Sequence, residues 1–237
     1  MTWVAGVDGC KGGWFVVLRN IQTRALSHHV VNEVSELMGL AENPQVIAID
    51  IPIGLLDKAE HGGRACDRAA RKLLGQPRGA SVFSPPVRGC LSCTDYLSAK
   101  NASRESSGAG ISLSRQAFAL IPKIREVDEW IKPNMQERIR EIHPELSFRA
   151  LNKECPMRQG KKKRAGLEER EGLLVNEGFG GLIEQTKPIP HKRVAPDDVL
   201  DACAACWSAG RILKKEVVCI PNSPPIDSRG LRMEMWY

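Results

Sequence analysis

The feature that most constrains this chain is a pair of apolar runs that each end on a carboxylate. Residues 2–9, TWVAGVDG, and residues 44–55, PQVIAIDIPIGL, are rich in the residues of buried strands and contain Asp8 and Asp50. A charged side chain at the end of a buried strand needs water, a counter-charge or a ligand, because its desolvation is costly. Ligands collect at the carboxyl ends of strands in open α/β sheets, so both aspartates are candidate site residues.

The order of the predicted elements indicates a mixed sheet. Short turns between the first three strands predict antiparallel hairpins, and Asn32 is predicted to cap the helix that follows. The predicted strands cover residues 2–9, 13–20, 25–31, 44–55 and 138–143, with a short one at 216–221. The predicted helices cover residues 32–41, 114–131, 164–178 and 195–213, with a basic helix within 62–79. We expect an α/β fold with a five-stranded sheet, three antiparallel strands followed by parallel strands, flanked by helices.

The same pattern predicts one domain. No internal repeat or linker divides residues 1–237, so we expect a single domain. A less regular segment at about 57–137, with Pro-rich and Ser/Gly-rich stretches, is predicted to be a helical and loop insertion within that domain.

A third group of acids opens the last predicted helix. Asp197, Asp198 and Asp201 are three or four residues apart, so a helix places them on one side of its first turns. With Asp8 and Asp50 they would repel one another unless a cation is present, and hard divalent ions prefer carboxylate oxygens. Two such ions ~4 Å apart can drive phosphodiester hydrolysis. The alternative is local: a helix cap at Asp197, and exposed acids that suit the helix dipole.

A second group of polar residues lies at the end of the fifth predicted strand. His143 and Glu145 flank a proline that can start a helix. They are candidates for an additional metal ligand or for a proton carrier near the scissile phosphate. A capped helix with a satisfied histidine is the alternative.

Basic residues and glycines supply candidate phosphate contacts. The turn GCKGG after the first strand contains Lys11 and Gly12, and its lack of side chains would let a phosphate approach. The segment 62–79 places four basic residues along one helix face: Arg64, Arg68, Arg71 and Lys72. A solvated helix face explains them equally well. The run GKKKR at 160–164 predicts a flexible loop first and a phosphate contact second, and the net charge of +6 favours anionic partners only weakly.

The eight cysteines do not follow the pattern of a secreted disulfide framework. Cys203 and Cys206 lie in a helical run of small residues and are predicted to pack in the core. Cys90 and Cys93 have C-x-x-C spacing in a turn-rich segment, but no second pair completes a zinc site, and metal binding there stays open. No apolar stretch is long enough for a membrane span, and the chain begins with a strand-like run, so we expect a cytoplasmic protein.

Several motifs together resemble a known family. They are VAGVDGCKGGWFV, AIDIPIGL, REIHPELSFRAL and DDVLDACAACWSA, with the basic stretches RACDRAARKLLG and SVFSPPVR. They are similar to domain of unknown function 429, a family described as predicted nucleases of ribonuclease-H-like fold, and the likeness covers nearly the whole chain. The resemblance implies that Asp8, Asp50, Asp198 and Asp201 bind Mg²⁺ or Mn²⁺, and that His143 and Glu145 line the same cleft. It also implies that Arg64, Arg68 and Arg88 face the phosphates of a nucleic acid.

Three functions stay open. The acids and the basic helix favour a Mg²⁺- or Mn²⁺-dependent nuclease. In the actin-like branch of the same fold an aspartate and a glycine-rich hairpin hold ATP, although no second glycine-rich loop is evident after residue 150. The third function is a non-catalytic nucleic-acid-binding module, whose binding would be metal-independent and strongly salt-dependent. The sequence leaves DNA against RNA, and monomer against homodimer, undecided.

Overall fold

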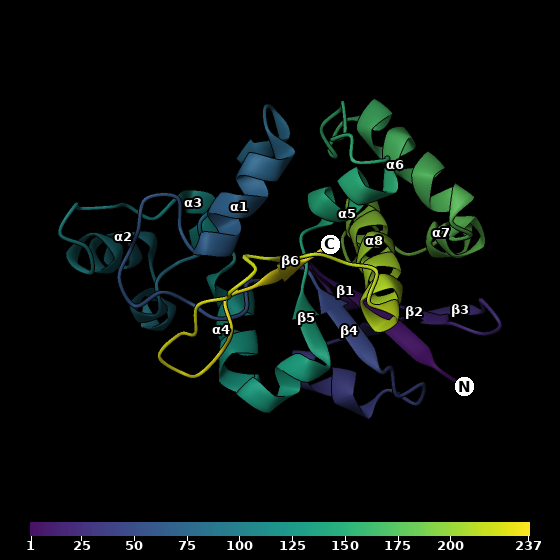
Figure 1. Ribbon diagram of the computed structural model, residues 1–237, viewed down its shortest axis with the longest axis horizontal. Helices are drawn as coiled ribbons and strands as arrows, with labels where there is room; N and C mark the ends of the chain where they lie inside the picture. The colour runs from purple at the N-terminus through teal and green to yellow at the C-terminus, as the bar shows by residue number, and fades with distance from the viewer. The chain divides into compact units, whose positions relative to one another are not determined.

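The computed structural model describes residues 1–237 and contains a five-stranded sheet in the order β3-β2-β1-β4-β5 (Figure 1). The strands are β1 Trp3–Cys10, β2 Gly13–Asn20, β3 Leu26–Val31, β4 Val46–Ile49 and β5 Ile139–Glu141. β1 pairs antiparallel with β2, as does β2 with β3, whereas β1 with β4 and β4 with β5 pair in parallel. The predicted α/β fold, with three antiparallel strands before the parallel ones, is confirmed.

Helices connect and flank these strands. The α-helices are α1 Ala65–Leu74, α2 Tyr96–Glu105, α3 Arg115–Ala119, α4 Ile121–Trp130, α5 Pro144–Leu151, α6 Arg164–Asn176, α7 Gly180–Thr186 and α8 Pro196–Lys214. The 3-10 helices are η1 Val34–Gly39, η2 Arg78–Ser81, η3 Arg88–Ser92 and η4 Pro133–Glu137. Two short strands, β6 Cys219–Ile220 and β7 Met235–Trp236, lie near the C-terminus.

The chain divides into two compact units. Unit 1 contains Met1–Asp50, Glu137–Val218 and Trp236–Tyr237, and unit 2 contains Ile51–Gln136 and Cys219–Met235. The five-stranded sheet and helices α5 to α8 belong to unit 1, whereas α1 to α4 belong to unit 2. The segment predicted as an insertion therefore supplies most of unit 2, and residues from the C-terminal part of the chain complete it.

Helix α8 packs on the sheet of unit 1 through small residues. Its fully buried residues include Ala202, Cys203, Ala205, Cys206 and Ala209. A Cβ atom at Gly6 of β1 would lie 1.9 Å from the Cys206 nitrogen and 2.2 Å from the Ala202 carbonyl oxygen, so only glycine fits this close approach. The prediction that Cys203 and Cys206 pack in the core is confirmed, and burial raises the pKa of the Cys206 thiol to about 12.

The segment after β3 differs locally from the prediction. It forms η1, and its N-cap is Glu33 rather than Asn32. The Glu36 side chain accepts hydrogen bonds at 2.9 Å from the backbone N–H groups of both Asn32 and Glu33. A glutamate at the third helical position thus satisfies the donors at this terminus.

Candidate metal centre

Asp8 and Asp50 are neighbours because of the register between two parallel strands. Val7 of β1 pairs with Ile49 of β4, and the backbone N–H of Asp50 donates to the Val7 carbonyl at 2.9 Å. The next residue on each strand is therefore an aspartate. The two apolar runs that suggested a site are adjacent in the sheet, and their carboxylates lie at the same edge.

The same sheet face carries α8. Gly6 meets the backbone of α8, and Ala48 is its partner in β4. Because side chains alternate between the faces of a strand, Asp8 and Asp50, two residues further along, also face α8. Asp201 directly precedes the Ala202 carbonyl that lies against Gly6, and its side chain is 1% exposed. Three aspartates distant in the sequence thus meet at one place in unit 1.

The electrostatics of these carboxylates reflect their closeness. Burial, followed by the charges of Asp50 and Asp201, raises the pKa of Asp8 well above its usual range. Burial and the charge of Asp201, with smaller effects of Glu141 and Glu145, raise the pKa of Asp50 to about 8. Burial also raises the pKa of Asp201. A buried acidic cluster of this kind destabilises its own charged form, and a bound cation would relieve it.

Asp198 shares its carboxylate between this cluster and the helix terminus. Its Oδ2 accepts a hydrogen bond from the backbone N–H of Ala195 at 2.9 Å, and Pro196 is the first helical residue. The prediction that Asp197 caps the helix is wrong. The N-cap residue is Ala195, and the carboxylate that accepts the hydrogen bond of the N-cap N–H is that of Asp198. Burial is the main cause that raises the pKa of Asp198 to about 6.

Lys161 enters the acidic cluster from the loop between α5 and α6. Its Nζ forms an ion pair with Oδ2 of Asp201. The charge of Asp201 is the main cause that raises the pKa of Lys161, and the charges of Asp8 and Asp50 contribute. The other oxygen of that carboxylate, Asp201 Oδ1, is buried and has no hydrogen-bond partner. Sequence reasoning assigned the GKKKR run to a flexible loop and missed this lysine. The only sequence signal was a cluster of cations between two helices.

His143 and Glu145 lie at the start of α5. His143 is the N-cap, and its Nδ1 accepts a hydrogen bond from the Glu145 N–H at 3.2 Å. The Glu145 carboxylate is buried and paired with Arg170 of α6, which is fully buried and also donates to the Gly166 carbonyl at 2.9 Å. The charge of Glu145 raises the pKa of Asp50, so Glu145 influences the cluster electrostatically. Its own Oε1 is paired with the Arg170 guanidinium. Sequence reasoning also missed Arg170.

The β1–β2 turn does not present a free phosphate cradle. Lys11 is exposed there, but the Gly12 N–H donates to the Arg193 carbonyl at 2.8 Å. At Gly13 the φ angle is +118°, and a Cβ would lie 2.1 Å from the Val31 carbonyl oxygen. The Gly12 N–H is therefore already bonded within the protein, and a phosphate contact at Gly12 stays a prediction. The glycines serve the packing of the hairpin itself.

Of the three predicted phosphate-facing arginines in unit 2, Arg64 is committed internally. It is the N-cap of α1 and is 1% exposed. Its guanidinium donates to Asp67 at 2.8 Å and to the carbonyls of Ile53 and Gly54 at 3.0 and 3.1 Å. Arg64 therefore does not lie on the exposed face of α1, since position 64 precedes the helix and its guanidinium is bonded inside the unit. Its contact with a phosphate stays a prediction without support from this geometry.

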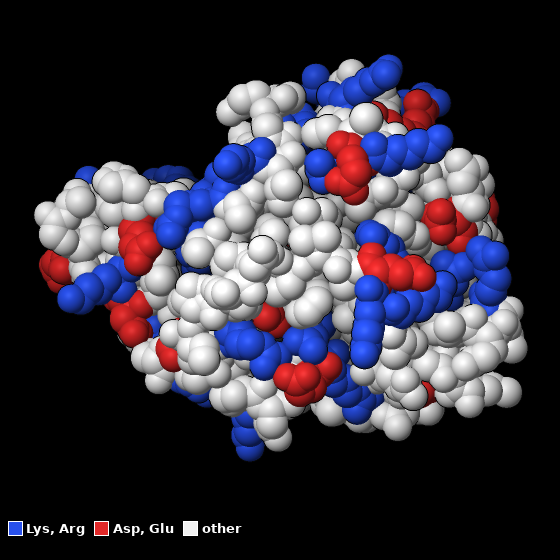
Figure 2. Space-filling model, in the orientation of Figure 1, with Lys and Arg blue, Asp and Glu red and all other residues white.

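Arg88 is also paired with acids of its own unit, whereas Arg68 is more exposed. Arg88 pairs with Asp128 at 2.8 Å and with Asp227, and its side chain is 18% exposed, so acids of the same unit already hold its guanidinium and its contact with substrate stays a prediction. Arg68 keeps a 45% exposed side chain in an ion pair with Glu60 at 3.0 Å. Figure 2 shows Lys and Arg side chains gathered over α1, where Arg68 remains the candidate.

Cys90 is held as a thiol. Its Sγ donates to the Ala99 carbonyl at 3.3 Å, and burial raises its pKa to about 11. Zinc ligands are thiolates, so this environment does not favour a metal at Cys90 and Cys93.

The comparison with protein-family models decides the family. The model for a protein of unknown function, DUF429, matches residues 6–226. The chain belongs to the DUF429 family. The match includes Asp8, Asp50, Asp198 and Asp201, so the DUF429 assignment made from the motifs is confirmed. No curated protein and no solved structure matches this DUF429 chain. None of its helices has the length and apolar character needed to cross a membrane.

Proposed function

We propose that this DUF429 protein is a metal-dependent nuclease that hydrolyses phosphodiester bonds of nucleic acid. The observation that carries the proposal is the mutual electrostatic effect of Asp8, Asp50 and Asp201, from two adjacent strands and α8, where Asp8 and Asp201 are buried and Asp50 is half-buried. Such a concentration of desolvated carboxylates is typical of sites for hard divalent cations.

Two observations on these carboxylates support the proposal of a divalent ion. Asp201 Oδ1 is buried without a partner, and Asp198 uses only its Oδ2 at the helix terminus. The ligands would be Asp8, Asp50, Asp198 and Asp201, and the ion would be Mg²⁺ or Mn²⁺, which prefer oxygen donors. When bound, such ions lower the pKa of water and stabilise the leaving oxygen of a phosphodiester.

Lys161 has two roles in this proposal. With no metal bound, its ammonium is the counter-charge of Asp201. Its side chain is 38% exposed, so it can also reach a substrate phosphate at the rim of the cluster. Lys11, which is exposed in unit 1, is a further candidate for a phosphate contact at this cluster. Arg68, which is exposed in unit 2, stays a candidate phosphate contact of that unit alone.

ATP binding in the manner of the actin-like branch has less support. That function needs backbone N–H groups of the β1–β2 hairpin to point at phosphates, and the Gly12 N–H is already bonded to Arg193. A non-catalytic nucleic-acid-binding module remains as an outcome of the test below.

The test combines metal binding with cleavage. Mn²⁺ binding is measured by calorimetry on the wild type, Asp8→Asn and Asp201→Asn, and cleavage of DNA and RNA substrates is measured with Mg²⁺, Mn²⁺ or EDTA. We expect saturable Mn²⁺ binding by the wild type, and a loss of affinity and of cleavage of ~100-fold or more in both variants.

Asp197→Asn is the matched control, because it removes one carboxylate from the same helix turn and Asp197 is outside the proposed ligand set. It should keep Mn²⁺ affinity and cleavage within about threefold of the wild type. Undiminished cleavage by Asp8→Asn would contradict the proposal, as would metal-independent nucleic-acid binding without any cleavage.

A further inference from the structure

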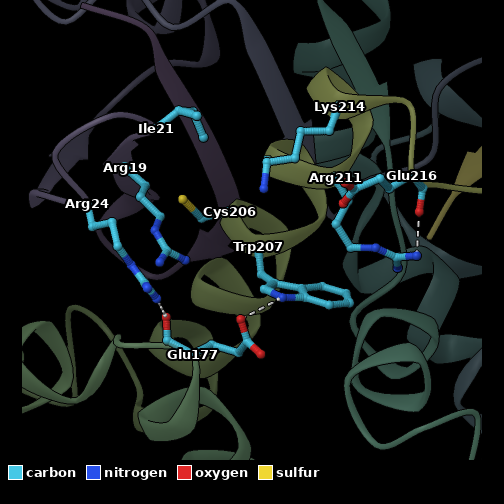
Figure 3. A pocket seen from close by; sticks show the side chains of 10 residues that line it. Arg19, Ile21, Arg24, Glu177, Cys206, Trp207, Arg211, Lys214 and Glu216 are labelled. Atoms are coloured by element: carbon cyan, nitrogen blue, oxygen red, sulfur yellow. Dashed lines mark hydrogen bonds between the residues drawn. The ribbon is translucent and has the colours of Figure 1, made fainter.

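A basic cavity lies beside the C-terminal half of α8 in unit 1. Its volume is about 450 Å³, within the range of small-molecule sites. It is lined by the end of β2, the turn that follows, the residue after α6 and the last turns of α8 (Figure 3). Arg211 in this lining is ten residues beyond Asp201, or ~15 Å of helix rise, so the cavity is separate from the acidic cluster.

Cations dominate the lining of this cavity. Its charged residues are the cations Arg19, Arg24, Arg211 and Lys214 and the acids Glu177 and Glu216. Glu177 is engaged by an indole, since its Oε2 accepts a hydrogen bond from Trp207 Nε1 at 3.2 Å. Glu216 is exposed, and its backbone carbonyl accepts the guanidinium of Arg211. The charge of Glu177 partly offsets that of Arg19, but four cations face two acids in this lining.

Arg19 and Arg24 have contacts, but none of these contacts is a carboxylate. The Arg19 guanidinium lies 5.0 Å from the centroid of the Phe179 ring, and Arg24 donates to the Glu177 backbone carbonyl at 3.3 Å. Burial and the charge of Arg24 lower the pKa of Arg19. Two guanidinium groups are therefore kept close together in a partly desolvated place, which a bound anion would stabilise.

The apolar part of the lining offers a second kind of contact. Figure 3 shows the charged ends of Arg19, Arg24 and Lys214 around the space beside Cys206, with Ile21 above and the Trp207 indole to one side. Arg211 stacks on that indole at 4.7 Å, which holds the ring in place. The cavity can therefore hold an organic group next to an anionic one.

We propose that this cavity binds a small phosphorylated molecule, whose phosphate is held by Arg19, Arg24 and Lys214 and whose organic part lies along Trp207 and Ile21. Arginine suits this task because its planar donors match phosphate oxygens, and lysine adds a mobile charge. The site does not depend on the proposed nuclease activity, because none of its residues belongs to the acidic cluster.

Calorimetric titration of the full chain with inorganic phosphate, adenosine 5′-monophosphate and adenosine tests this proposal. We expect one saturable site for the monophosphate, weaker binding of inorganic phosphate and none of adenosine. Arg19→Gln and Arg24→Gln should each weaken monophosphate binding at least tenfold, since each loses a charge-assisted hydrogen bond. Arg24 is exposed, so its variant serves if Arg19→Gln does not fold.

Lys132→Gln is the matched control: it removes one exposed positive charge that does not line the cavity, and it should bind as the wild type does. Asp8→Asn should also retain binding, which separates this site from the acidic cluster. The proposal is overturned if the wild type binds neither phosphate compound, or if Lys132→Gln weakens binding as much as Arg19→Gln.

Discussion

At the scale of single residues, the cost of placing charge in the acidic cluster is clearest at Asp50. The backbone of Asp50 continues β4, while its carboxylate shares a face with Asp8 and Asp201. Its pKa of about 8 means that, without a cation, the folded protein retains a proton on this cluster at pH values where an ordinary aspartate is ionised. The acid that marks the site in the sequence is thus a source of instability in the fold.

The pH dependence of stability should reveal this cost. Between its ordinary pKa of 3.8 and about 8, Asp50 binds more protons in the folded state than in the unfolded state, so stability falls as pH rises through that interval. Asp50→Asn removes the ionisable group. With EDTA present, we expect the Tm of Asp50→Asn to equal that of the wild type near pH 3.8. Near pH 8 the Tm of the variant should exceed that of the wild type by ~4 °C or more.

Thermal melts at three pH values across this interval measure the effect. Mn²⁺ should raise the Tm of the wild type at the upper pH and leave that of Asp50→Asn nearly unchanged, since the variant lacks a ligand. A Tm difference between the two proteins that does not vary with pH would refute this account of Asp50.

At the scale of elements, the contact between α8 and β1 sets the position of the site. Small residues on α8 and Gly6 on β1 let two backbones come together, and this contact carries Asp201 to the strand ends. Any side chain at position 6 would push the helix away from the sheet. This displacement of α8 would also separate Asp201 from Asp8 and Asp50.

Gly6→Ala should therefore be strongly destabilising. Its Cβ would lie within 2.2 Å of two backbone atoms of α8, and backbone cannot rotate aside, so we expect a loss of ~3 kcal/mol or more. Gly172→Ala is the control, because it lies in the exposed interior of α6 with no atom within 4 Å of the new Cβ. That change should stabilise the protein by ~0.5–1 kcal/mol through helix propensity. Denaturant unfolding measures both, and equal stability of the two variants would contradict the close approach.

At the scale of the whole molecule, unit 2 is held together by a group of ion pairs around Arg88. In unit 2, Arg88 joins Asp128, from the long central segment, to Asp227, from the C-terminal segment. Asp227 also accepts the Leu55 N–H at 3.0 Å. One arginine thus ties together parts of the chain that are far apart in the sequence.

Arg88→Gln should destabilise unit 2 selectively. It removes this cation from Asp128 and Asp227, at a cost of ~2 kcal/mol, since Asp128 keeps its ion pair with Arg229 at 2.9 Å. Hydrogen exchange should show faster exchange in α4 and η3, while amides of β1 and β2 keep their protection. Arg68→Gln, which breaks an exposed ion pair, is the control and should cost less than ~1 kcal/mol. Uniform loss of protection in both units would contradict this picture.

Much of the fold could be predicted from the sequence because its determinants are local. Apolar runs and short turns define β1 to β4, and helical periodicity with Pro196 defines α8. Asp8 and Asp50 each end an apolar run, which is why they could be paired as candidates without any coordinates, whereas the adjacency of β1 and β4 is given by the structure. Their position at the ends of buried strands depends only on neighbours in the sequence.

The tertiary structure decided which charges are buried and what they contact. In the sequence Arg64 looks like an exposed helix cation and Arg88 like a cation of a Pro-rich turn, yet both are paired with acids within unit 2. Lys161 looks like part of a flexible loop, yet it reaches Asp201, forty residues further on. Burial and ion pairing depend on contacts between distant segments, and a residue's neighbours in the sequence do not specify them. The sequence therefore determined where acids end strands, and only packing decided which cations meet them.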